Sequence, residues 1–296
     1  MAIVVELAPC SKERCPDALT TKLGFIRIAE LNQERRLMIR VVDVSHHYGV
    51  RPVLSHVSLD VPARRLVVLM GPNGVGKSTL LSIVAGLIAP ARGYVEINGL
   101  RRRSSEGAEL EIRKQIAFLS DQPWLPEFKT GREWLMAVGQ LYDLEVERLM
   151  DHISRLLELF QLAEKGESPI RTYSNGQKKK LAICGVLVTE APILVLDEPF
   201  TGGLDAAAIL ALSRVLKHLA DQRDNTILMA SQIGEMVEPL AHRIAILEGA
   251  RLKAYDTLDG LRAQTGCSGS LSEVFEKLVH PQTLEQIESY FNRPKA

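Results

Sequence analysis

Residues 71–79 carry the pattern that points most directly to chemistry. They read Gly-Pro-Asn-Gly-Val-Gly-Lys-Ser-Thr and match G-x-x-x-x-G-K-[ST], directly after the apolar run Leu66–Met70 and before helical spacing over 77–88. Glycines let such a loop turn its N–H groups inward, and the start of a helix adds a positive dipole end. The segment therefore predicts a phosphate-binding loop. The alternative is a glycine-rich turn with an accidental lysine, which the order of strand, loop and helix disfavours.

Each polar residue of this loop has an expected role. Lys77 is expected to neutralise the β- and γ-phosphates of a nucleotide, and Ser78 to ligate Mg²⁺. The residues expected to surround the phosphates are Gly71, Asn73, Gly74, Gly76, Lys77, Ser78 and Thr79.

Two adjacent acids end a second apolar run, 193–197. In a parallel sheet the carboxyl end of a strand faces the ligand crevice, so Asp197 is placed to hold Mg²⁺. Glu198 follows it and is placed to polarise the water that attacks the γ-phosphate. A solvated acidic turn after a core strand is the alternative, and the phosphate loop upstream favours the metal site.

The elements that must position these residues alternate along the chain. Apolar runs predict strands, and three- and four-residue apolar spacing predicts helices. The predicted strands are 39–45, 57–61, 66–70, 94–97, 116–119, 193–197, 226–230 and 243–247; the predicted helices are 77–88, 129–162, 206–220, 257–264, 271–279 and 283–291. This alternation implies an α/β fold with a mostly parallel sheet covered by helices.

Composition narrows the class of protein. The 296 residues carry a formal net charge of +0, which argues against nucleic acid as a partner. No apolar stretch approaches the ~20 residues that span a bilayer, so any role at a membrane is expected to be indirect. The four cysteines form no CxxC pair, and Cys184 lies in an apolar run where a buried free thiol is expected.

Between the two motifs, residues 173–177 read Tyr-Ser-Asn-Gly-Gln and resemble the signature sequence of ATP-binding cassette (ABC) ATPases. The order of phosphate loop, signature and Asp-Glu strand also matches that family, over about residues 39–255. The resemblance implies a P-loop NTPase core, an N-terminal antiparallel β-subdomain and an inserted α-helical subdomain at about 125–185. We expect the ATPase domain at 38–255 and a C-terminal helical extension at 256–296. Residues 1–37 are expected to be either a peripheral N-terminal extension or, if translation begins at Met38, no part of the natural protein.

The resemblance also implies how the chain works. Two ATPase subunits, identical or different, would dimerise head to tail with MgATP between them, and Ser174, Gly176 and Gln177 would cap the γ-phosphate from the partner. A polar helix start is the alternative for this segment. The lysine run 178–180 is expected on the solvated face of the helix that follows, rather than in a nucleic-acid-binding patch. Tyr48, in the turn between the first two predicted strands, would stack on adenine, and Asp205 would reach the partner's site.

The subclass it most resembles exports drugs and antibiotics. There the ATPase lies on the cytoplasmic face of the membrane and drives a separate membrane-spanning subunit.

Three loops depart from the family pattern, and all three would sense the γ-phosphate. Asp121, with Gln122 beside it, stands where the family has a glutamine; residues 199–205 contain one extra glycine; and Gln232 stands where the family has a histidine. Intact Glu198 favours an ATP-hydrolysing transporter subunit. The departures favour the alternative, an ATP-gated regulatory or binding module that dimerises in the same way but turns over slowly.

Overall fold

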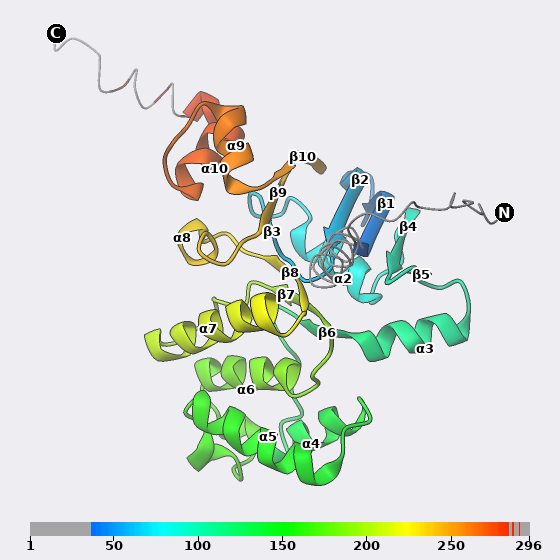
Figure 1. Ribbon diagram of the computed structural model, residues 1–296, viewed down its shortest axis with the longest axis vertical. Coiled ribbons are helices and arrows are strands. Elements are labelled where there is room, and N and C mark those ends of the chain that lie inside the picture. Colours follow the sequence, from blue (N-terminus) through cyan, green and yellow to red (C-terminus); the bar gives the residue numbers. More distant parts are fainter. Residues whose placement is uncertain (1–36, 284–285, 287–289, 291–296) are drawn as a thin grey trace, which may run out of the picture. The chain divides into compact units, whose positions relative to one another are not determined.

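The computed structural model describes residues 37–283, together with 286 and 290 (Figure 1). Within that part, four strands form an antiparallel sheet in the order β2-β1-β4-β5. They are β1 (Leu37–His47), β2 (Pro52–Pro62), β4 (Arg92–Ile97) and β5 (Leu100–Arg101). Alternate residues of β2 such as Leu59 and Val61 are buried, as in a sheet with one face on the core.

A second sheet of the described residues holds six strands in the order β10-β9-β3-β8-β7-β6. They are β3 (Leu66–Met70), β6 (Ile116–Leu119), β7 (Ile193–Asp197), β8 (Thr226–Ala230), β9 (Arg243–Glu248) and β10 (Arg251–Asp256). All neighbouring strands are parallel except β9 and β10. Every residue of β3, β7 and β8 is buried, because helices cover both faces of this sheet. The mostly parallel core and the antiparallel subdomain are therefore confirmed.

The described helices are α2 (Lys77–Ala85), α3 (Glu106–Gln115), α4 (Gly131–Gln140), α5 (Val146–Leu159), α6 (Asn175–Leu187), α7 (Ala206–Gln222), α8 (Gly234–Val237), α9 (Leu258–Thr265) and α10 (Leu271–Val279), with short 3-10 turns at η1 (Ala163–Lys165) and η2 (Ile170–Thr172). Helices α4, α5 and α6 pack on one another, coloured green in Figure 1. They form the inserted helical subdomain.

Several elements differ from the predicted ones. The helical stretch 129–162 is two helices, because the chain turns between them, with Asp143 at a φ of 59° in the left-handed region. Strand β10 and helix α3 were not predicted. Most of the predicted helix 283–291 and all of residues 1–36 lie outside the described residues.

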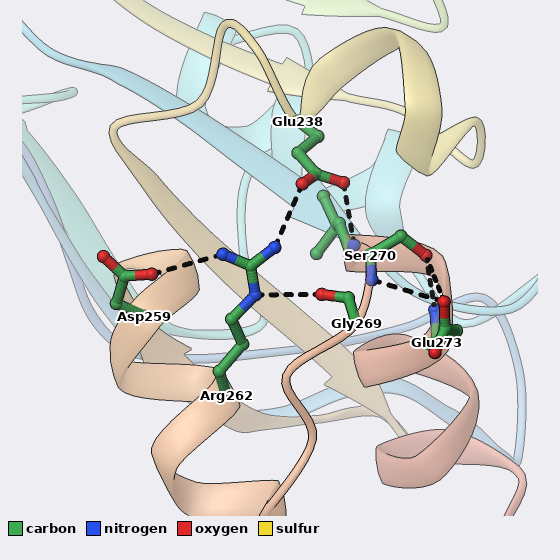
Figure 2. A network of polar contacts seen from close by, with 7 residues as sticks. Glu238, Asp259, Arg262, Gly269, Ser270 and Glu273 are labelled. Atoms are coloured by element: carbon green, nitrogen blue, oxygen red, sulfur yellow. Dashed lines mark hydrogen bonds and ion pairs between the residues drawn. The ribbon is translucent and has the colours of Figure 1, made fainter.

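The C-terminal helices α9 and α10 share a core with the sheet, through buried residues such as Leu261 and Val274. Figure 2 shows a polar network that joins them to α8. Arg262 contacts Glu238 at 3.3 Å and donates to the Gly269 carbonyl at 2.9 Å, and Glu238 accepts the N–H of Leu271 at 2.8 Å. Among the described residues, no helix is long and apolar enough to span a bilayer.

Candidate functional site

The loop from β3 to α2 has a backbone that only glycine permits at two places. A Cβ on Gly76 would lie 2.7 Å from the Val53 carbonyl oxygen, and Gly76 has a φ of +109°. A Cβ on Gly71 would lie 2.5 Å from the carbonyl oxygen of Leu247 on β9. These close approaches fix the loop against the strands beneath it, and the exposed Asn73 and Gly74 lie at its tip.

Lys77, the first residue of α2, is folded back over this loop. Its side chain donates to the carbonyl oxygens of Gly71 at 2.8 Å and Pro72 at 3.2 Å, and the residue is only 6% exposed. Burial lowers the pKa of the Lys77 ammonium, and the nearby Glu198 and Asp197 oppose that shift. The loop therefore holds a buried cation beside the two acids, as the β- and γ-phosphates of a nucleotide require.

Asp197 and Glu198 lie at the carboxyl end of β7 and are 3% and 8% exposed. Burial raises the pKa of both carboxyl groups, while a side-chain hydrogen bond from Ser78 to Asp197 opposes the shift at that acid. Among the described residues, Asp197 Oδ1 and Glu198 Oε2 are buried without a hydrogen-bond partner. Unpaired buried carboxylate oxygens beside a hydroxyl suit a hard divalent cation and a water, so these residues fit Mg²⁺.

Gln232 follows β8 and points at the same acids. Its side-chain amide donates to Glu198 Oε1 at 3.1 Å, and this contact lowers the pKa of Glu198 against the effect of burial. The Glu198 N–H donates to the carbonyl of Ala230, and the Ser231 N–H to that of Leu69. The ends of β3, β7 and β8 are thereby tied together, and they bring Lys77, Ser78, Asp197, Glu198 and Gln232 to one place.

The sequence interpretation of the lysine run 178–180 was wrong for two of its members. Lys179 and Lys180 are 3% and 7% exposed, not solvated. Lys179 donates to the backbone carbonyl of Asp121 at 3.0 Å, and Lys180 contacts the Asp205 carboxylate at 2.6 Å. Helix α6 packs against α4, α5 and β6, so it has little solvated face. The absence of a polar stripe in the rest of this helix was the available signal.

Tyr48 lies just after β1, and its ring is exposed to solvent. The side chain is 66% exposed, its hydroxyl is 3.4 Å from Thr79 Oγ1, and the ring of His46 packs edge-on with centroids 4.9 Å apart. An aromatic face beside the phosphate loop is suited to stacking on a base. Gln122 is also exposed, next to Asp121.

The segment 174–177 starts helix α6 with a capping box. Ser174 Oγ accepts the Gln177 N–H at 3.2 Å, and Gln177 Oε1 accepts the Ser174 N–H at 2.9 Å. Gly176 lies so close to residue 203 that a Cβ would be 2.4 Å from the Gly203 carbonyl oxygen. In the described part of the chain, no hydrogen bond or ion pair joins this exposed helix start to residues 71–79. Asp205 caps α7 by accepting the Ala208 N–H at 2.8 Å.

Comparisons with known proteins agree with this geometry. The family described as "ABC transporter" matches residues 54–201. A daunorubicin resistance ATP-binding protein of Streptomyces coeruleorubidus is 32% identical over 77% of this chain and 71% of its own length. A Nod factor export ATP-binding protein of Rhizobium leguminosarum bv. viciae is 31% identical over 77% of this chain and 72% of its own.

Solved structures are similar over the same region. The ATP-binding subunit of an ABC transporter has a TM-score of 0.76 at 33% identity, covering 81% of this chain and 99% of that one. A dimeric bacterial ABC transporter cassette has a TM-score of 0.68 at 25% identity, covering 75% of this chain and 99% of that one.

Proposed function

The chain belongs to the ABC transporter family as an ATP-binding, ATP-hydrolysing subunit, and from that premise we propose that it powers export by a separate membrane-spanning partner. Two copies, or this chain and a related one, close around MgATP on the cytoplasmic face of the membrane. Each ATP lies between the phosphate loop of one subunit and residues 174–177 of the other.

One observation carries the dimeric mechanism. The helix start at Ser174 is exposed and its side chain is satisfied within its own turn. The free backbone N–H groups at the start of α6 and the positive end of its helix dipole are suited to bind an anion. No hydrogen bond or ion pair of the described residues joins this helix start to the phosphate loop of the same chain. A second subunit that brings its own phosphate loop to this helix start supplies that anion as the γ-phosphate.

Within the site, the roles follow from position. Lys77 holds the β- and γ-phosphates, and Ser78 and Asp197 hold Mg²⁺, which would neutralise charge on the transferred phosphoryl group. Glu198, with an unpaired oxygen and a backbone anchored to Ala230, orients and polarises the attacking water. Tyr48 stacks on adenine.

Export is supported by two relatives, the daunorubicin resistance ATP-binding protein and the Nod factor export ATP-binding protein. The second candidate, a slowly hydrolysing ATP-gated module, is favoured by Gln232, whose amide replaces a histidine and is engaged with Glu198. A single-turnover ATPase measurement separates the two: hydrolysis that keeps pace with dimer formation supports the motor, and a long-lived ATP-bound dimer supports the module.

The partner is tested with the tagged full chain in its native host. We expect a mild-detergent extract with MgATP to yield the chain together with a polytopic membrane protein, in a complex that contains two ATPase subunits. The matched control is Lys77→Ala, which is expected to bind ATP at least about 100-fold more weakly. A chain recovered free of any membrane protein, while still hydrolysing ATP, would contradict the transporter proposal and leave the ATPase intact.

A further inference from the structure

The places where this sequence departs from its family meet at one point. The hydroxyl of Thr201, in the loop with the extra glycine, is 2.9 Å from the Glu198 carbonyl oxygen and 3.4 Å from Asp121 Oδ1. The side chain of Lys179 reaches the backbone carbonyl of Asp121 at 3.0 Å. Residues far apart in sequence thus form a chain of contacts from α6 through residue 121 to Glu198.

Charge explains why a lysine lies there. A glutamine at position 121 would be neutral, whereas Asp121 adds a negative charge, and its Oδ1 lies 3.4 Å from the Thr201 hydroxyl that also contacts the Glu198 carbonyl oxygen. Burial lowers the pKa of the Lys179 ammonium, and Asp121, Asp197 and Glu198 all oppose that shift. Lys179 is therefore a second buried cation near these acids, in addition to Lys77, and it offsets the charge that Asp121 adds.

Packing explains why the charge comes from a long side chain. A Cβ on Gly202 would lie 3.4 Å from Cγ and Cδ of Lys179, so the methylenes of the lysine run beneath the loop 199–205. Gly202 has a φ of +85°, which suits glycine. The lysine stem supports this loop while its ammonium reaches residue 121.

We propose that Lys179 is a positioning residue for ATP hydrolysis. It acts indirectly: its buried ammonium holds the loop through the backbone carbonyl of Asp121 and offsets the charge of the Asp121 carboxylate, so that Thr201 and Glu198 keep their places. Asp121 and Lys179 act as a compensating pair: with a neutral residue at position 121, loss of the lysine charge should lower kcat less. This proposal rests on the ATPase site described above.

The test is a double-mutant cycle on the full chain, with kcat and KM for ATP and the melting temperature measured for each protein. Lys179→Met keeps the stem and removes the charge, so we expect kcat to fall about tenfold or more with KM changed by less than about twofold. Adding Asp121→Asn to that variant is expected to raise kcat several-fold above Lys179→Met alone, and Lys179→Arg to retain most of it. The control is Lys217→Met, an exposed lysine on α7.

Two results would overturn the proposal. One is an unchanged kcat in Lys179→Met; the other is a kcat loss that Asp121→Asn does not reduce, which indicates a structural role. If Lys179→Met does not fold, Lys179→Gln tests the charge by the same cycle and the same criteria. A failed ATPase assignment looks different, because the wild type itself would then not hydrolyse ATP or Glu198→Gln would remain active.

Discussion

Two regions of the proposed site are built in different ways. The first is the predicted phosphate loop, residues 71–79, and the second is the set of loops expected to surround the γ-phosphate, at 121–122, 199–205 and 232. In the first, the side-chain hydrogen bonds of Lys77 are short-range and end on backbone carbonyls, those of Gly71 and Pro72, a few residues before it. In the second, single side-chain contacts cross long stretches of chain, as from Lys179 to Asp121 or from Gln232 to Glu198.

The difference follows from what each region must do. A loop set by local backbone geometry is preorganised and binds ATP with little rearrangement. Loops that are held by a few side-chain contacts tolerate substitutions, provided that a second substitution restores the lost contact or the lost charge. The departures from the family pattern lie in the second region, and we expect substitutions there to affect turnover more than binding.

The largest effect is expected in the phosphate loop itself. Lys77→Ala removes the buried ammonium that lies beside Asp197 and Glu198, and charge-assisted contacts to two phosphates are lost with it. At about 1.5–3 kcal/mol each, their loss weakens ATP binding by roughly 100-fold to more than 10,000-fold. Calorimetric titration of MgATP checks this, with Lys217→Ala as the control. Unchanged affinity would show that residues 71–79 are not the phosphate site.

The next effect is on chemistry alone. Glu198→Gln keeps the size of the side chain and its hydrogen bonding but removes the charge that polarises water. We expect kcat to fall by roughly 100- to 10,000-fold with ATP affinity preserved. On size exclusion this variant should form a dimer in MgATP and remain a monomer without it. Undiminished hydrolysis would make another acid the base, and Asp121 is the nearest candidate by sequence pattern.

Sequence patterns predict one of these regions better than the other. Strands β3, β7 and β8 were predicted at their observed bounds, because a strand buried on both faces is a continuous apolar run. Helix α3 buries only Ile112, so it has no apolar stripe to detect. In the second region, the apolar remainder of α6 indicates that the lysine run is buried, but it does not identify the contacts of Lys179 and Lys180, because Asp121 and Asp205 lie far away in sequence.

The residues of the candidate site also fall into two groups, those that the fold itself brings together and those whose roles depend on a bound nucleotide or a second subunit. The motif residues that sequence assigned to phosphate, metal and water are brought together by the sheet. The roles of Tyr48, Ser174, Gly176, Gln177 and Asp205 stay predictions, since they need a bound nucleotide or a second subunit.

A smaller effect is expected at Gln232, in the second region. Glutamine can donate a hydrogen bond but carries no positive charge, so charge developing on the transferred phosphoryl group is less well stabilised than by histidine. A deficit of ~1–3 kcal/mol corresponds to roughly a ten- to hundred-fold slower turnover. Gln232→His should therefore raise the ATPase rate with nearly unchanged ATP affinity. Equal or lower turnover would mean that the longer loop 199–205 already compensates.

The smallest effect is expected where the second region is supported from a distance. Helix α8 begins two residues after Gln232, and the network in Figure 2 ties it to α9 and α10 through Glu238 and Arg262. A Cβ on Gly234 would lie 2.6 Å from Ser272 Oγ, so the start of α8 also packs closely on α10. The C-terminal helices thus fix the element that follows the Gln232 loop.

Arg262→Met removes the contacts to Glu238 and Gly269 while keeping the apolar stem. We expect a loss of about 1–2 kcal/mol in the free energy of unfolding, which lowers the melting temperature by roughly 2–8 °C for a domain of this size. The control is Asp259→Asn, since the side chain of Asp259 is 91% exposed and contributes little to the network.

The ATPase assay on the same variant sharpens the comparison between the two regions. If the Gln232 loop depends on distant support, Arg262→Met should lower kcat about two- to threefold, equivalent to ~0.4–0.7 kcal/mol, with ATP affinity unchanged, because the phosphate loop has its own local contacts. A fall in affinity equal to the fall in kcat would contradict the distinction, since it would mean that the phosphate loop is not independently organised. A lower melting temperature with unchanged kcat would confine the network to stability.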